Sequence, residues 1–550
     1  MNVQDAIVET LRREGVTTFF CFPTTSMIEA AVAGGLRPVI CRQERVGVHM
    51  ADGFARVTNG KPVRVFAMQY GPGAENAFAG VASAYSDSTP ILLLPLGHSL
   101  EQQQVFPLFS SARSYASVTK SVETIMQPEQ TPDVMRRAFN ALHNGRPGPV
   151  MVELPRDVVG REIPDNAGEY RGVRASRSAP AARDVEDAAK LLVEATCPVI
   201  LAGQGVLYAE ASDELVRLAE LLQAPVMTTV DGKSAFPEDH ALALGTGGNG
   251  FTGAGSVFLL DKADVILAVG CGLTRHPLST PNLPDRAKLI HNTNDTRDLN
   301  KTYATDVGLL GDAKLTLGHL IAAVLDRLDR RTVERAPALD IARANATWRA
   351  KWEAKLGATT APINPYRMIA EFQQVVDTAD VIMTHDSGSP REQLLPFYQA
   401  KRPRGYLGWG KSHQLGTGLG LNIGAKIAAP DKFCVNIMGD AAFGMTGLDF
   451  ETAVRCGVPI LTIVFNNSSM AIETRHMGLS HEKYRARDLG GNYAALARDL
   501  GGWSERVEQP GQIGEAILRA RRQTEEGKSC LLEFITNEET AFSQGDMARP

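Results

Sequence analysis

This sequence of 550 residues has no closely spaced cysteines, little net charge and no long hydrophobic runs. The seven cysteines are scattered and form no C-x-x-C pair, which argues against a disulfide framework or a structural zinc site and favours a reducing compartment. The net charge of −5 creates no field that would attract nucleic acid or an anionic membrane. No apolar run approaches the ~20 residues of a spanning helix, and no signal peptide is visible. We therefore expect a cytoplasmic protein without a nucleic-acid or membrane partner.

Short apolar runs alternate with helical patterns, which predicts parallel sheets covered by helices. A polar linker over 161–183 and a charged helical stretch over 326–356 separate these runs into three groups. We therefore predict an α/β fold of three doubly wound parallel-sheet domains, at 1–165, 185–330 and 360–536, with a polar tail at 537–550. The expected strands are 18–22, 38–41, 63–68, 91–94, 150–154, 199–202, 226–229, 265–269, 288–291, 381–384, 433–438, 460–465 and 529–534.

An acid and an amide follow two successive apolar runs in the third group. Asp440 lies in Gly-Asp-Ala-Ala-Phe-Gly after the first run, and Asn467 closes an Asn-Asn pair after the second. Ligands collect at the carboxyl ends of parallel strands. Asp440, Asn467 and the backbone carbonyl of Ser469 offer oxygens to a hard cation such as Mg²⁺, and amides beyond Gly439 would face phosphates. The alternative is a capping Asp in a tight strand-to-helix turn.

This Gly-Asp and Asn-Asn pairing resembles the thiamine diphosphate signature of the acetolactate synthase, benzoylformate decarboxylase and pyruvate decarboxylase superfamily. The resemblance implies Mg²⁺ ligation by Asp440, Asn467 and Ser469, with Ala441 where many relatives have glycine. It also implies that the three domains bind the aminopyrimidine, occupy the centre and bind the diphosphate, respectively. Further matches in the first domain are Gly71-Pro72-Gly73 with Asn76, Asp87-Ser88-Thr89-Pro90, Gly145-Arg146-Pro147-Gly148-Pro149 and Leu154-Pro155-Arg156-Asp157.

Glu44 opens a predicted helix, where an acid is favoured by the helix dipole alone. The resemblance implies a proton relay instead, in which Glu44 bonds to N1′ of the aminopyrimidine and N4′ takes the C2 proton to give the ylid. It implies that Leu415 supports the bent cofactor. It also implies that one subunit's first domain faces another's third domain, in a homodimer or homotetramer with active sites at the interface. The other implied cofactor contacts are Gly73, Asn76, Ser387, Gly388, Gln414, Gly439, Ala442 and Met470.

The resemblance implies two further catalytic candidates at the substrate pocket, Glu473 and His98. Ile472-Glu473 is similar to the same stretch in pyruvate and indolepyruvate decarboxylases, where a carboxyl group can protonate the enamine left after CO₂ departs. A helix acid facing solvent, paired with Arg475 or His476, is the alternative. His98 falls where relatives place polar pocket groups. We therefore predict a 2-oxo acid decarboxylase acting through ylid and enamine intermediates. The alternatives are an acetolactate synthase-like carboligase, a 2-hydroxyacyl-CoA lyase and, outside the family, a nucleotide-binding oxidoreductase.

A second ligand in the central domain stays open. Gly203-Gln204-Gly205 and the Gly232-Lys233 region resemble synthase relatives that hold FAD or ADP. A bare G-x-G lacks the rest of a dinucleotide fingerprint, and Thr293 replaces one of two acids while Asp295 is retained. No flavin is therefore assigned.

Overall fold

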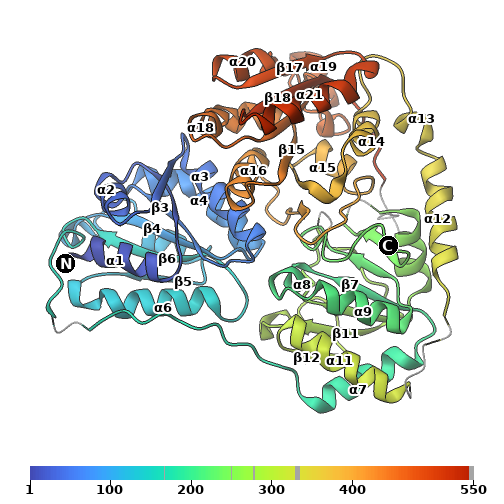
Figure 1. Cartoon of the computed structure of the whole chain (residues 1–550), viewed down its shortest axis with the longest axis horizontal. Helices are drawn as coiled ribbons and strands as arrows, with labels where there is room; N and C mark the ends of the chain where they lie inside the picture. The colour runs from blue at the N-terminus through green and yellow to red at the C-terminus, as the bar shows by residue number, and fades with distance from the viewer. Residues whose placement is uncertain (166–167, 249–250, 277–278, 329–332, 334, 544–550) are drawn as a thin grey trace.

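Three six-stranded, all-parallel sheets make up the protein, and this confirms the predicted α/β class. The computed structural model describes residues 1–165, 168–248, 251–276, 279–328, 333 and 335–543. The sheet orders are β2-β1-β3-β4-β6-β5, β12-β11-β10-β7-β8-β9 and β14-β13-β15-β16-β18-β17. Helices flank each sheet, and the three lobes meet at the centre of Figure 1.

The N-terminal sheet contains β1 (Thr18–Phe22), β2 (Arg37–Ile40), β3 (Arg64–Met68), β4 (Ile91–Gly97), β5 (Ser121–Thr124) and β6 (Val150–Pro155). Its helices are α1 (Val3–Arg13), α2 (Thr25–Ala33), α3 (Glu44–Val57), α4 (Pro72–Ser86), α5 (Ser111–Tyr115) and α6 (Thr131–His143). The central sheet contains β7 (Pro198–Ala202), β8 (Val226–Thr228), β9 (Ala243–Thr246), β10 (Val265–Val269), β11 (Lys288–Thr293) and β12 (Val307–Leu310). The helices from here to the third sheet are α7 (Ala182–Glu194), α8 (Gln204–Tyr208), α9 (Ser212–Leu222), α10 (Gly253–Gly255), α11 (Ala313–Arg327), α12 (Ala338–Ala350) and α13 (Glu353–Leu356).

The C-terminal sheet contains β13 (Val381–His385), β14 (Tyr406–Leu407), β15 (Phe433–Gly439), β16 (Leu461–Asn466), β17 (Trp503–Val507) and β18 (Cys530–Ile535). Its helices are α14 (Pro365–Val375), α15 (Ser389–Leu394), α16 (Thr417–Ala428), α17 (Asp440–Thr446), α18 (Phe450–Arg455), α19 (Gly478–Tyr484), α20 (Tyr493–Asp499) and α21 (Ile513–Glu525). In the described part of the chain, no helix has the length and apolar character needed to cross a bilayer.

Helices α3 and α16 join the N-terminal and C-terminal lobes by unusually close backbone packing. A Cβ atom on Gly424 would lie 1.9 Å from the Met50 carbonyl oxygen, and one on Gly53 would lie 2.1 Å from the Leu421 carbonyl oxygen. Glycine at these positions lets the two backbones touch, which a side chain would prevent. The contact places the start of α3, with Glu44, beside the C-terminal lobe (Figure 1).

Gly424→Ala is therefore expected to lower the free energy of unfolding, because the added methyl group must push α3 and α16 apart. Overpacking of this kind costs about 1–3 kcal/mol. Gly318→Ala is the matched control, since a Cβ atom there meets nothing within 4 Å and alanine favours a helix by about 1 kcal/mol. Denaturant unfolding measures both variants, and equal stabilities would contradict the proposed role of this packing.

Candidate active site

Asp440 lies where β15 ends and α17 begins. Its carboxylate is buried, and only one of its two oxygens accepts a hydrogen bond. Oδ1 accepts a hydrogen bond from the Ala441 amide at 2.8 Å. Oδ2 has no hydrogen-bond partner among the described residues. Burial raises the pKa of Asp440 to about 6, although backbone amides of Ala441 and of the turn at 467–469 oppose the shift. An orphaned carboxylate oxygen in such surroundings fits a cation.

The turn that faces Asp440 is built by two successive asparagines. Asn466 ends β16 and fixes the turn, because its amide nitrogen donates to Glu533 at 2.7 Å and its oxygen accepts from the Ser468 amide at 3.0 Å. Ser468 has a φ of 55°, in the left-handed region. The side-chain oxygen of Asn467 accepts from the Ser469 amide at 3.0 Å. The second asparagine is thereby held at the edge of the sheet next to Asp440.

A cavity of about 100 Å³ surrounds these groups, and we call it the Asp440 cavity. It brings together most of the predicted C-terminal site residues, namely Ser387, Gly388, Leu415, Gly439, Asp440, Ala441, Ala442, Asn467, Ser469, Met470 and Glu473. Glu473 ends a short 3₁₀ helix, Ala471–Glu473, and its side chain is 46% exposed. One of its oxygens lies 3.9 Å from Nδ1 of His476. Glu473 thus borders the cavity. It also lies near His476, the partner expected if Glu473 is a surface acid.

The N-terminal site residues form a separate group. Glu44 is the first residue of α3 and is buried, and Asn76 of α4 donates to it at 3.3 Å. Burial raises the pKa of Glu44, so this carboxyl group holds a proton more readily than usual. Gly73 is buried in α4, and His98 follows β4 with its ring 5.0 Å from that of Tyr70. None of these four residues lines the Asp440 cavity of the same chain.

Gln414 lies between the two groups without lining the cavity. Its amide nitrogen donates to the Ala79 carbonyl oxygen of α4 at 2.8 Å. It therefore connects α4 with the segment that leads through Leu415 into α16.

Two buried aspartates that sequence reasoning did not assign hold the site together. Asp386 accepts hydrogen bonds from the amides of Gly416 at 2.9 Å and Gly418 at 2.8 Å, and burial raises its pKa to about 6. Asp449 accepts from the Arg42 amide at 2.8 Å, just before Glu44. Asp449 and Arg42 are 407 positions apart in the sequence, so no local pattern could reveal their contact.

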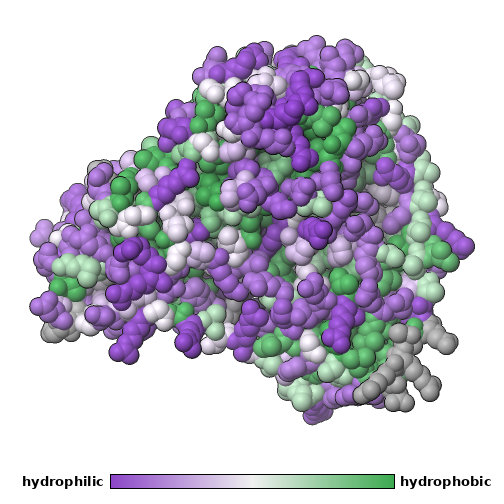
Figure 2. All heavy atoms as spheres, viewed as in Figure 1, coloured by the Kyte–Doolittle hydropathy of each residue, from purple (hydrophilic) through white to green (hydrophobic). Residues whose placement is uncertain are grey.

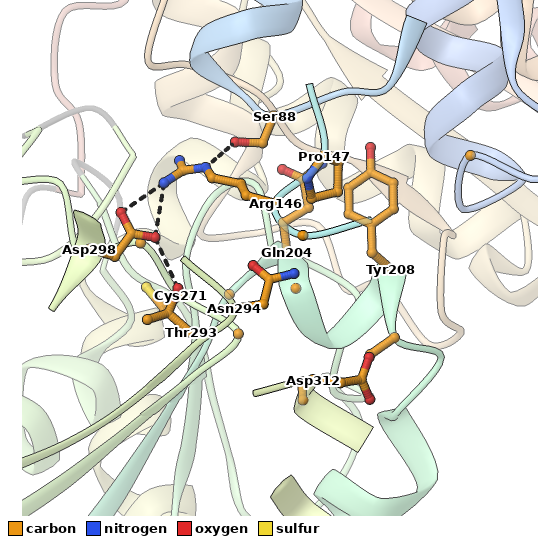
Figure 3. Close-up of a pocket in the computed structure, with 18 of the residues that line it drawn as sticks. Ser88, Arg146, Pro147, Gln204, Tyr208, Cys271, Thr293, Asn294, Asp298 and Asp312 are labelled. Carbon is orange, nitrogen blue, oxygen red and sulfur yellow. Dashed lines mark hydrogen bonds and ion pairs between the residues drawn. The ribbon is translucent and has the colours of Figure 1, made fainter. Parts of the chain in front are cut away.

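A larger cavity of about 250 Å³ lies between the N-terminal and central lobes, and we call it the Arg146 cavity (Figure 3). Gly203, Gln204 and Gly205 line it. Arg146 donates to Asp298 at 2.7 and 2.9 Å and to Ser88 at 2.8 Å. Other cations at its wall are also paired, as Lys411 is with Asp231.

Comparisons with known proteins cover most of the chain. The models named "Thiamine pyrophosphate enzyme" match in succession, with the N-terminal TPP binding domain at residues 1–124, the central domain at 185–320 and the C-terminal TPP binding domain at 386–534. The chain is 32% identical to a probable acetolactate synthase large subunit of Methanocaldococcus jannaschii, over 94% of this chain and 90% of the relative. It is 28% identical to the acetolactate synthase isozyme 3 large subunit of Escherichia coli, over 98% and 93%. It is 29% identical to a probable 2-ketoarginine decarboxylase of Pseudomonas aeruginosa, over 94% and 90%.

Proposed function

Because the chain belongs to the thiamine pyrophosphate-dependent enzyme family, we propose that it is an acetolactate synthase-like carboligase. Such an enzyme decarboxylates one 2-oxo acid and joins the remaining acyl group to a second carbonyl compound. The observation that carries this proposal is similarity over nearly the whole chain to acetolactate synthase large subunits. The sequence favoured decarboxylation as the net reaction, and the comparisons support its carboligase alternative better. The family also removes the case for a nucleotide-binding oxidoreductase.

The Asp440 cavity would hold the diphosphate end of the cofactor through a divalent cation. The orphaned Oδ2 of Asp440 supports this assignment, with the Asn467 amide oxygen and the Ser469 carbonyl as further oxygen ligands for Mg²⁺. Ser387 and Gly388 also line the cavity, where amide and hydroxyl groups can meet phosphate oxygens. When bound, thiamine diphosphate would supply a C2 carbanion as the nucleophile and a positively charged thiazolium ring that takes up the electron pair left when CO₂ departs. Leu415 lines the wall on which that ring would rest.

A second copy of this chain would complete the site with Glu44, whose carboxyl group would exchange a proton with the aminopyrimidine N1′. The Asp440 cavity is about 100 Å³, whereas pockets for ligands of this size hold roughly 300 Å³ or more. Hydrophobic side chains are also exposed where the N-terminal and C-terminal lobes meet (Figure 2). Phe106 is 92% exposed, and Leu448 and Leu479 are exposed in the C-terminal lobe. Packing of a second copy over such side chains would remove apolar surface from water.

We assign no flavin or ADP to the Arg146 cavity. A diphosphate there would have to displace Asp298 from Arg146 or Asp231 from Lys411. Removing a buried carboxylate from its cation is costly, so a nucleotide would need other anchors.

Product analysis tests the proposed function directly. The purified chain, with thiamine diphosphate and Mg²⁺, is incubated with pyruvate alone and with pyruvate plus a second 2-oxo acid. We expect CO₂ release together with a 2-hydroxy-3-oxo acid, detected by chromatography. Release of free aldehyde as the main product would favour net decarboxylation instead.

Net decarboxylation is the second candidate, and the place of Glu473 at the Asp440 cavity favours it, as does the 2-ketoarginine decarboxylase relative. A carboxyl group there can give a proton to the carbon that has lost CO₂.

If Glu473 donates this proton, Glu473→Gln should lower aldehyde formation by about 100-fold or more and raise the share of ligated product. Glu482→Gln, in α19 of the same segment, is the control. An unchanged product ratio would leave Glu473 as the partner of His476 at the surface.

A further inference from the structure

The segment that carries the proposed cation ligands is closed at its base by a short ladder. Ser469 and Asp488 form an antiparallel bridge. The Met470 amide donates to the Arg487 carbonyl at 2.9 Å, and the Leu489 amide donates to the Ser468 carbonyl at 2.9 Å. The residues that line the Asp440 cavity here are therefore paired with a segment nearly twenty positions further along the chain.

Arg487 joins three parts of the structure through one nitrogen. This side chain is buried, at 8% exposure. Nη1 donates to Thr474 Oγ1 at 2.7 Å, to Glu538 Oε2 at 3.1 Å and to Ser469 Oγ at 3.3 Å. Ser469 is a proposed cation ligand, and Thr474 is the neighbour of Glu473. Arg487 thus holds both ends of the stretch 469–474 that faces the cavity.

Glu538 belongs to a C-terminal strap, Asn537–Ser543, which the sequence predicted as part of a polar tail. The strap is fixed along its length by contacts with the rest of the chain, and residues 544–550 lie outside the described part. Glu539 pairs with Lys355 at 2.6 Å and accepts from Asn364 at 2.9 Å. The Ser543 hydroxyl accepts from Trp348 at 2.8 Å. The strap therefore runs from the C-terminal sheet past α13 and the start of α14 to α12.

Electrostatics favour the contact between the strap and the cavity segment. Arg487 Nη1 lies 3.1 Å from Glu538 Oε2, and the arginine side chain is buried. A buried guanidinium that lost Glu538 would keep its charge without a carboxylate partner. The ion pair therefore favours contact between the strap and the segment.

We propose that Arg487 and Glu538 are positioning residues through which the C-terminal strap holds the 469–474 segment against the Asp440 cavity. The inference rests on the proposed function for the identity of the ligand, thiamine diphosphate with a divalent cation. Neither residue lines the cavity, so both act through Ser469 and Glu473.

The test measures amide hydrogen exchange and ligand affinity in the full chain. Arg487→Ala should speed exchange over 468–474 and 487–489, and should raise the Kd for thiamine diphosphate with Mg²⁺ by about tenfold or more, as loss of a supporting contact does at metal sites. Lys483→Ala, which removes an exposed cation of α19 in the same segment, should change neither quantity. Wild-type exchange together with a wild-type Kd in Arg487→Ala would overturn the proposal.

Two milder variants keep the test decisive if Arg487→Ala does not fold. Arg487→Lys keeps the charge on a shorter side chain, which moves the donor nitrogen away from its three acceptor oxygens, and Glu538→Gln removes only the charge of the carboxylate. Each should weaken binding, and the double variant should lose no more than the stronger single variant, because both act through one network. Additive losses of affinity in the double variant would contradict a shared network.

If the wild type binds no thiamine diphosphate, the proposed function fails, while the exchange measurement still decides whether Arg487 holds the segment.

Discussion

Asp440→Ala is expected to abolish binding of thiamine diphosphate and all turnover. Its Oδ2 is the orphaned buried anion of the Asp440 cavity, and the remaining oxygens of Asn467 and Ser469 are neutral. Without a carboxylate, a divalent cation loses its charged protein ligand, and the diphosphate loses its bridge to the protein. The loss in affinity should exceed the roughly 10–100-fold that removal of a supporting contact costs a metal site.

Isothermal titration calorimetry of the apoenzyme with thiamine diphosphate, with and without Mg²⁺, measures this effect. Asp499→Ala, which removes an exposed aspartate at the end of α20, is the matched control and should bind as the wild type does. Since Asp440 is buried at the start of α17, circular dichroism must show that the variant is folded. A folded Asp440→Ala enzyme with normal affinity would refute the cation site.

Glu44→Gln is expected to leave the fold and most cofactor binding intact and to slow exchange of the thiazolium C2 proton. An amide cannot share a proton with N1′ as a carboxyl group can, and proton transfer by a placed side chain contributes roughly 10²–10⁴-fold. The raised pKa of Glu44, caused by burial, suits a group that must carry a proton at neutral pH. Activity should fall by the same order.

Quenched-flow deuterium exchange at C2 reports the step without any substrate. Glu29→Gln, an exposed glutamate of α2, serves as the control. Exchange as fast as in the wild type would remove Glu44 from the proton relay.

The interior strands were predictable from sequence, while most edge strands were not. The strands that were missed, β5, β9, β12, β14 and β17, all lie at sheet edges. An interior strand is buried on both faces and reads as a continuous apolar run, as β10 does. An edge strand such as β17, Trp-Ser-Glu-Arg-Val, is partly exposed and carries charges, so its composition resembles that of a loop.

The sequence predicted those candidate site residues whose place can be read from the local pattern of strands. Asp440 and Asn467 were identified because each directly follows a buried strand. Asp449, Arg487 and Glu538 were missed, because their roles depend on contacts between residues 13 to 407 positions apart. The resemblance gave the chemistry of Glu44, and the fold alone shows its separation from the Asp440 cavity.

Subunit complementation tests the central claim most directly, namely that Glu44 of one subunit and Asp440 of another act on one cofactor. Glu44→Gln and Asp440→Ala chains, each with its own tag, are co-expressed and the mixed oligomer is purified by both tags. In a mixed dimer one of the two sites then contains Glu44 and Asp440 unaltered, so about half of the wild-type activity should return. If the mixed oligomer is as inactive as its two parents, both residues act within one chain and the account is wrong.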